Sequence, residues 1–182
     1  MIARNRLIVA LDVPTVHQAQ QLIDTLGDSV NFYKIGMELV YGDDGLGLAR
    51  ALVAQGKDVF IDLKLLDIPN TVERATARLA DIGAKFLTVH AYPHVMDAAL
   101  RGVGDSTLEL LAVTVLTAFD DYDLEVAGYA VGVDCLVNQR ARHAQSQGLH
   151  GIVCSAADVF FGFCRSIEDN QTICPDWGLP IG

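Results

Sequence analysis

The chain has 182 residues, of which 51% are hydrophobic and 20% are charged, and its formal net charge at pH 7 is -10. This composition can bury a substantial core and excludes an intrinsically disordered chain. The acidic balance argues against nucleic acid as a partner, because nucleic-acid backbones bind cationic surfaces, although a local cationic pocket could still hold a small anion.

The start of the chain, residues 1–14, contains only one short apolar run, residues 7–11, which is too short for a membrane span or a convincing signal peptide. We therefore expect a cytoplasmic protein without membrane association.

The apolar run of residues 7–11 is also the first of the predicted strands, which alternate with segments of helical period. In chain order, the predicted strands are residues 7–11, 30–35, 58–63, 86–89, 108–116 and 151–153. The predicted helices are residues 15–26, 46–55, 69–82, 95–102 and 133–147, with a weaker helix that begins near Ala156.

Local signals mark the ends of several of these helices. Thr15 is the expected N-cap of the first helix, and Gly83 is expected to close the helix of residues 69–82. The glycine-rich run of residues 41–47 is interpreted as a turn into the next helix, since it does not match the dinucleotide-binding pattern G-x-G-x-x-G.

The alternation of strands and helices predicts an α/β fold with an all-parallel sheet covered by helices. A doubly wound sheet is disfavoured because no G-x-G-x-x-G follows the first strand. A (β/α)8 barrel, the TIM-barrel type, is favoured because polar residues gather at the carboxyl ends of the strands, where barrel active sites lie. These residues are Asp12, Lys34, Asp62 with Lys64, His90 and Thr117. We expect a single barrel domain over residues 1–182.

Cysteines and histidines give no indication of a metal site. Cys135, Cys154, Cys164 and Cys174 are widely separated and form no Cys-x-x-Cys pair, which is typical of ordinary buried thiols in a reducing compartment. His90 is interpreted as a hydrogen-bonded histidine at a strand end rather than as a catalytic base.

The stretch of residues 59–71 carries the most functional information. Strand alternation places Phe60, Asp62 and Lys64 on one face of the third strand. A carboxylate and an ammonium group inside a barrel form either a structural ion pair or a reaction centre, and their spacing alone leaves these alternatives equal. Asp12 taken alone is a turn or capping residue, and Lys34 taken alone is a solvated strand end. Together the four charges favour a reaction centre.

The motif Asp62-x-Lys64-x-x-Asp67-Ile-Pro-Asn-Thr71 resembles the signature of the orotidine 5'-phosphate decarboxylases. The resemblance extends over residues 6–158 in the order that the family has. Supporting motifs are Leu-Asp at residues 11–12, Lys-Ile-Gly at 34–36, Thr-Val-His-Ala at 88–91 and Ala-Val-Thr-Val-Leu-Thr at 112–117. After residue 91 the family usually has a Ser-Gly-Gly-like turn, whereas this chain has Tyr-Pro-His-Val.

This resemblance implies a carboxy-lyase that converts orotidine 5'-monophosphate to uridine 5'-monophosphate in pyrimidine synthesis, without a metal or an organic cofactor. Lys64 would be the proton donor, and Asp62 would lie against the substrate carboxylate. Lys34 would link the carboxylates and the ribose, Asp12 would hold ribose hydroxyls, and Thr117 would line the pyrimidine pocket.

The resemblance further implies a homodimer with shared active sites. Asp67, as a catalytic residue, and Thr71 would reach the partner's site, and Ile68 would also contact substrate. This assignment agrees with the chemistry, because loss of carbon dioxide from orotate C6 leaves a carbanion that fixed positive charge must stabilise. A lysine ammonium held by carboxylates can stabilise that charge and then protonate it.

Two alternatives remain open. The first is a metal-dependent sugar-phosphate decarboxylase or aldolase of the same superfamily, which shares the Asp-x-Lys-x-x-Asp core but typically has an acidic metal ligand where this chain has Lys34. A magnesium requirement would identify it. The second is a truncated, catalytically impaired remnant.

The remnant alternative rests on the divergent tail, residues 159–182. In the family, the substrate phosphate is expected to lie between the loops after strands seven and eight. The seventh strand of the family usually ends in a Thr-Pro-Gly-Ile-Arg-like turn, and the eighth ends in Gly-Arg. The corresponding stretch here, residues 172–180, has no arginine. We therefore expect an incomplete barrel of six to seven βα units without an eighth strand, with exposed edges on strands one and seven. The expected kcat/KM is at least ~1000-fold below that of a complete relative.

Overall fold

The computed structural model of this chain describes residues 7–154 and 171–173. Its strands are β1 (Val9–Ala10), β2 (Phe32–Gly36), β3 (Asp58–Leu65), β4 (Phe86–His90), β5 (Glu109–Val113), β6 (Gly151–Val153) and β7 (Gln171–Ile173). Its α-helices are α1 (Val16–Leu26), α2 (Met37–Gly42), α3 (Gly45–Ala54), α4 (Pro69–Ala80), α5 (Pro93–Val103), α6 (Asp121–Val126) and α7 (Val133–Gln147), and a short 3-10 helix, η2, covers Gly27–Ser29.

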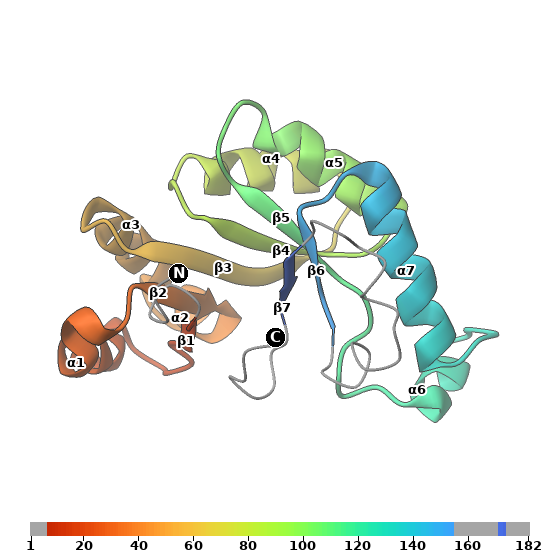
Figure 1. Cartoon of the computed structure of the whole chain (residues 1–182), viewed down its shortest axis with the longest axis horizontal. Helices are drawn as coiled ribbons and strands as arrows, with labels where there is room; N and C mark the ends of the chain where they lie inside the picture. The colour runs from red at the N-terminus through yellow and green to blue at the C-terminus, as the bar shows by residue number, and fades with distance from the viewer. Residues whose placement is uncertain (1–6, 155–170, 174–182) are drawn as a thin grey trace.

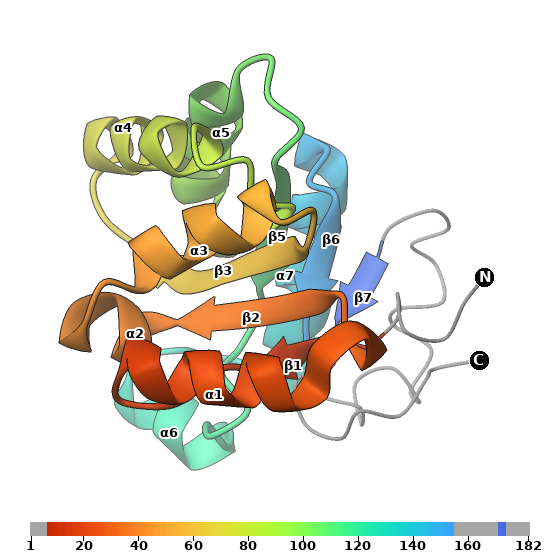
Figure 2. The same cartoon turned by 90° about the vertical axis from the view of Figure 1, so that its left-hand side faces the viewer.

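The seven strands form one parallel sheet in the order β1-β2-β3-β4-β5-β6-β7, with β1 and β7 at its edges. The sheet curls, and the helices lie on its outer face, with α1 and α3 beside the first strands and α4, α5 and α7 beside the later ones (Figures 1 and 2). This arrangement confirms the predicted TIM-barrel type of fold. Within the described residues the barrel is incomplete, as expected, since they contain no eighth strand.

The predicted elements agree with the structure where they are long. The bounds of α7 and β6 are the predicted ones, and Thr15 caps α1 by accepting a hydrogen bond from the backbone N–H of Gln18 at 3.3 Å. Gly83 has φ 80°, the left-handed conformation expected after α4. The six-residue helices α2 and α6 were missed, because so few residues cannot display a helical period.

Two sequence predictions on the later part of the chain have different outcomes. Residues 171–173 form β7, where the seventh strand was expected, whereas the helix near Ala156 and the rest of the divergent tail lie outside the described residues. Cys154 is buried as predicted, but Cys135 is exposed in the first turn of α7, so the prediction of a buried thiol was wrong there. Cys164 and Cys174 lie outside the described residues.

Two apolar clusters flank the sheet and determine where polar residues can lie. The larger cluster packs the outer face of the sheet against the helices. The smaller one lies on the concave face and joins Phe32, Phe60, Phe86 and Leu111, with ring centroids of Phe32 and Phe86 at 5.5 Å. Phe32 and Phe86 are the first residues of β2 and β4, so these rings fill the barrel interior at the amino ends of the strands. The carboxyl ends remain for polar side chains.

No helix in the part of the chain that the structure describes is long and apolar enough to cross a membrane.

Candidate active site

A polar layer lies directly above the aromatic layer inside the sheet. Lys34, Asp62 and Thr88 each follow a phenylalanine of that cluster by two residues, and residues two apart on a strand share a face. The two layers are therefore stacked along β2, β3 and β4, as layers of side chains are inside a parallel barrel. This stacking brings the polar side chains together at the carboxyl ends.

The charged side chains form an alternating row, Asp12, Lys34, Asp62 and Lys64. Lys34 Nζ lies 3.1 Å from Asp12 Oδ2 and 3.5 Å from Asp62 Oδ2. Lys64 Nζ lies 2.9 and 2.8 Å from the two carboxylate oxygens of Asp62. Gly36 leaves room for this row, because a Cβ there would lie 3.2 Å from Asp12 Oδ1. The structure thus brings these four predicted residues together.

The backbone of β3 departs from a regular strand at Lys64. Between the pairs Ile61 with Leu87 and Leu65 with Val89, β3 advances by four residues while β4 advances by two. Lys64 has φ 47°, a left-handed conformation that costs a non-glycine residue ~1–3 kcal/mol. Lys64 and Asp62 lie together as predicted, but the backbone between them is not the regular strand from which the prediction was made. A bulge, rather than the plain pleat, directs the Lys64 ammonium group back to Asp62.

Thr88 holds both parts of this irregular segment. Its hydroxyl donates to Asp62 Oδ1 at 2.8 Å and accepts from the backbone N–H of Lys64 at 2.9 Å. The residue is fully buried, so each of these hydrogen bonds replaces contacts with water. Thr88 belongs to the Thr-Val-His-Ala motif of residues 88–91, which did not predict a role for its hydroxyl. The available signal was a hydroxyl between Phe86 and His90 in the interior-facing register of β4.

Removal of this hydroxyl tests its positioning role. Thr88→Val keeps the side-chain shape and should destabilise the fold by about 1–3 kcal/mol, because the Lys64 N–H and one lone pair of Asp62 lose a partner. It should also lower kcat more than it raises KM, since the Lys64 ammonium group would lose its fixed orientation. Chemical denaturation and steady-state kinetics measure the two effects. Thr76→Val is the matched control, because it removes a buried hydroxyl that has no hydrogen-bond partner among the described residues. Equal effects of both substitutions would contradict the role of Thr88.

The charges of the row are unequally exposed. Asp62 has a side-chain exposure of 12%, whereas Asp12 is 53% exposed. Burial alone would raise the pKa of Asp62, but hydrogen bonds from Lys64 and Thr88 and the positive charges of Lys64 and Lys34 outweigh it and hold the pKa below its ordinary value. Asp62 is therefore ionised at neutral pH, and two ammonium groups share this one buried carboxylate. With Asp12 the row is neutral overall, but Lys34 and Lys64 supply two local positive charges for an anionic group of a ligand.

The segment after β3 lies beside the row. A cavity of about 240 Å³ is bordered by Lys64, Asp67 and Thr71, together with Tyr41 and Leu66. The Asp67 carboxylate accepts a hydrogen bond from the backbone N–H of Ile68 at 2.7 Å. Within the described residues no hydrogen bond or ion pair joins Asp67 to Asp62, Lys64 or Lys34. Asp67 and Thr71 therefore share a cavity with Lys64 but stand outside the charged row.

Two other predicted residues lie beyond the row. Thr117 is exposed in a turn after β5, and no hydrogen bond between described residues connects its side chain to the charged row. His90 ends β4 as predicted, but its ring makes no hydrogen bond to another described residue, so that part of the prediction was wrong. Burial, followed by the positive charges of Arg140 and Lys64, lowers the pKa of His90, which leaves the imidazole neutral at pH 7.

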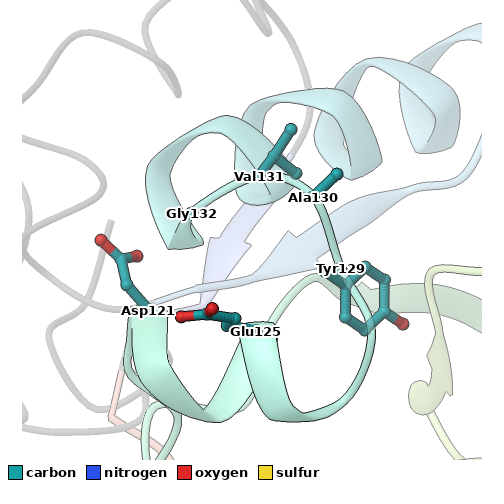
Figure 3. A pocket seen from close by; sticks show the side chains of 6 residues that line it. All are labelled: Asp121, Glu125, Tyr129, Ala130, Val131 and Gly132. Carbon is teal, nitrogen blue, oxygen red and sulfur yellow. The ribbon is translucent and has the colours of Figure 1, made fainter.

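A larger hollow, of about 410 Å³, lies elsewhere, between α6 and the start of α7 (Figure 3). The carboxylates of Asp121 and Glu125 border it, and the ring of Tyr129 lies on its opposite side. Its acidic lining disfavours an anionic ligand. Volume alone would favour this hollow, but the charges place the candidate active site at the smaller cavity.

Comparison with known proteins identifies the family. The model of the orotidine 5'-phosphate decarboxylase / HUMPS family matches residues 5–178. The chain belongs to this family. An orotidine 5'-phosphate decarboxylase of Bradyrhizobium sp. (strain BTAi1) is 60% identical over 156 residues, which cover 86% of this chain and 64% of the relative. One from Rhodopseudomonas palustris (strain TIE-1) is 59% identical over 156 residues, which cover 86% of this chain and 65% of the relative.

A solved structure supports the same assignment. The crystal structure of orotidine 5'-phosphate decarboxylase from Lactobacillus acidophilus superposes with a TM-score of 0.85 at 35% identity, and the match covers 93% of this chain and 80% of that one. The family resemblance and the TIM-barrel type predicted from the sequence are thus confirmed. The chain spans about 64% of the length of the curated relatives it matches.

In this family member's site, an ammonium group lies between the two carboxylates of the charged row. In the described residues, no group of three or more histidine, cysteine, aspartate or glutamate side chains is arranged to hold a metal ion. The Lys34 ammonium group lies between the two carboxylates of the row and would repel a divalent cation placed there.

Proposed function

We propose that the protein is a carboxy-lyase that converts orotidine 5'-monophosphate to uridine 5'-monophosphate in pyrimidine biosynthesis, without a metal or an organic cofactor. The observation that carries this proposal is the row of Asp12, Lys34, Asp62 and Lys64, in which two ammonium groups flank one buried carboxylate. The relatives named as orotidine 5'-phosphate decarboxylases support it.

The row suits the electronic demand of this reaction. Departure of carbon dioxide leaves a lone pair at C6 that no adjacent carbonyl stabilises, and the Lys64 ammonium group supplies both the stabilising charge and the proton. Asp62 binds Lys64 through both oxygens and thus fixes the donor. The substrate carboxylate would enter beside Asp62, where Lys34 and Lys64 offset its charge.

The remaining substrate contacts follow from the positions of the side chains. Asp12 is the exposed end of the row and would accept hydrogen bonds from ribose hydroxyls, with Lys34 between the ribose and Asp62. Ile68 is the N-cap of α4 beside the cavity that Lys64 borders, and we place it at the substrate as well, whereas Thr71 in the first turn of α4 would reach the substrate in the partner's site. Thr117 follows β5 and would face the pyrimidine. Residues 172–180 correspond to the segment that contributes to the phosphate site in the family. Of these, only residues 172 and 173, which belong to β7, are described.

A sensitive assay of the purified 182-residue chain tests this function. We expect release of labelled carbon dioxide from carboxyl-labelled orotidine 5'-monophosphate, with uridine 5'-monophosphate as the product and no loss of rate in EDTA. Turnover of a sugar phosphate that requires magnesium would instead support the metal-dependent alternative. Absence of label above the rate without enzyme would refute the proposal. A cytoplasmic location is part of it, since both nucleotides are water-soluble metabolites.

We further propose that the functional unit is a homodimer with shared active sites. Tyr41, Leu66 and Ile68 are exposed apolar side chains, and they lie at or beside the cavity of Lys64, Asp67 and Thr71. Clustered apolar exposure is typical of an interface, and a second copy of this chain would cover it. Asp67 stands outside its own row, and among the described residues its only hydrogen bond is local, from the backbone N–H of Ile68 to Oδ1, so we propose that its other carboxylate oxygen reaches the partner's site.

Mixed variants test this sharing directly. Lys64→Ala and Asp67→Ala chains, each inactive alone, should regenerate one intact site in every heterodimer. After complete random exchange, about a quarter of the wild-type activity should return, because half the dimers are mixed and each has one intact site. Activity is measured after subunit exchange has been verified by mass spectrometry with one labelled chain. No recovery after verified exchange would place Asp67 in the site of its own subunit.

A further inference from the structure

A buried arginine binds three loops at the mouth of the barrel. Arg140 of α7 is 9% exposed. Its guanidinium donates one hydrogen bond to the carbonyl of Thr114 and another to the Tyr129 hydroxyl, the latter at 2.9 Å. It also lies 4.7 Å from the centroid of the Tyr92 ring, while the Tyr92 and Tyr129 hydroxyls are hydrogen-bonded at 2.7 Å. We call Arg140, Tyr92 and Tyr129 the Arg140 clamp.

Each group that the clamp holds belongs to a different segment. Thr114 directly follows β5, Tyr92 follows β4 by two residues, and Tyr129 lies between α6 and α7. Thr114 is also fixed on its other side, because its hydroxyl donates to the carbonyl of Val153 in β6 at 3.1 Å. The chain that leaves β5 is therefore held between β6 and the clamp.

The chemistry of the clamp indicates a requirement for an arginine at this position. In the described part of the chain, the Arg140 guanidinium donates to a carbonyl and to a phenol, and not to a carboxylate. These two hydrogen bonds and the faces of the Tyr92 and Tyr129 rings offset the cost of burying its charge. Only the planar guanidinium fork can donate to two acceptors and lie over a ring at once. The hydrogen bond with Tyr92, followed by burial, raises the pKa of Tyr129, so this phenol stays protonated.

The clamp borders the proposed active site on the side of β4 and β5. β4 connects the two, because Thr88 of this strand binds Asp62, and the ring of His90 at its end lies 6.4 Å from the ring of Tyr92, centroid to centroid. In the proposed function, the ribose lies at Asp12 and the reacting carbon beside Lys64. The far edge of the pyrimidine must then extend from β3 toward the ends of β4 and β5, where the clamp fixes the backbone.

We propose that Arg140 is a positioning residue which, with Tyr92 and Tyr129, fixes the chain after β5 as the wall that receives the pyrimidine base. This inference rests on the proposed function, because it uses the placement of the ribose and of the reacting carbon. Arg140 itself touches neither the substrate nor the charged row. Its effect is on the affinity for the base, and loosening the wall weakens the ground state and the transition state alike.

Binding of two ligands that differ only in the base separates this role from a general loss of structure. Uridine 5'-monophosphate contains the pyrimidine, and ribose 5-phosphate has the same sugar and phosphate without it. Arg140→Leu in the 182-residue chain should raise the Kd for uridine 5'-monophosphate at least ~10-fold, and that for ribose 5-phosphate less than ~2-fold. Tyr129→Phe, which removes only the shared hydroxyl, should act in the same direction by about 3-fold to 10-fold. Arg140→Lys, which keeps the charge but not the fork, should fall between wild type and Arg140→Leu.

Arg142→Leu is the matched control, because Arg142 lies on the same helix, is exposed and, among the described residues, donates only to Asn138 of α7. It should leave both Kd values unchanged. Parallel weakening of both ligands, or no weakening of uridine 5'-monophosphate by Arg140→Leu and Tyr129→Phe, would overturn the inference. If Arg140→Leu does not fold, Tyr129→Phe decides by the same comparison. These measurements require no turnover, so loss of the base-specific effect and failure to release labelled carbon dioxide are separate results.

Discussion

Lys64→Ala is expected to lower kcat/KM for orotidine 5'-monophosphate by at least ~10,000-fold while the protein remains folded. Loss of a general acid alone costs ~100-fold to ~10,000-fold, and loss of the charge that stabilises the C6 carbanion adds to it. Release of labelled carbon dioxide measures the rate, and circular dichroism measures the fold. Substantial turnover by a folded Lys64→Ala chain would contradict the role of Lys64.

Two further variants separate chemistry from structure in this experiment. Lys85→Ala removes a lysine that pairs with Asp58 at the amino end of the barrel, with 3.7 Å between Nζ and Oδ2, and it should retain activity. Lys64→Gly should be as inactive as Lys64→Ala but more stable by about 1 kcal/mol, because glycine adopts the left-handed backbone of this position without strain. Equal stability of the two variants would contradict the backbone conformation at residue 64.

Much of the fold was predictable because its signals are local. Strands of apolar residues and helices such as α7 display their period over enough residues to be recognised. The short helix α6 does not, since its start depends on a capping box in which Asp120 and Asp123 bind each other's backbone N–H groups. The sequence predicts the parallel barrel type of fold. It does not predict how the individual strands pair and curl.

The candidate site was predictable to the extent that it follows strand register. Lys34, Asp62 and Thr88 stand two residues beyond Phe32, Phe60 and Phe86, so all three belong to one layer. The positive φ of Lys64 was not predictable, because it depends on the pairing of β3 with β4. Arg140 lies on the buried face of α7 with Leu136 and Ala144, but its hydrogen bonds to Thr114 and Tyr129 depend on tertiary packing that the sequence does not reveal.

Asp62→Asn is expected to lower kcat/KM at least ~1000-fold at pH 7 and to change how the stability of the protein depends on pH. Asparagine keeps the shape but leaves two ammonium groups without the carboxylate between them, so Lys64 loses its orientation and Lys34 repels it. At neutral pH the free energy of unfolding should fall by about 1–3 kcal/mol, since three hydrogen bonds to a buried charge are weakened or lost.

The sign of the pH effect follows from the lowered pKa of Asp62 in the folded chain. A carboxylate of this kind stabilises the fold fully above its pKa in the unfolded chain, about 4, and the contribution disappears as the pH falls through the lower folded value. The stability difference between wild type and Asp62→Asn should therefore be constant from about pH 5 to pH 7 and decrease below about pH 4.

Asp58→Asn, at the opposite end of β3, is the control, because Asp58 pairs with Lys85 in a more exposed position and should give a smaller difference at every pH. Urea unfolding at a series of pH values measures both variants. A difference for Asp62→Asn that stays constant into strong acid would show that the buried carboxylate does not hold the two lysines as the structure places them.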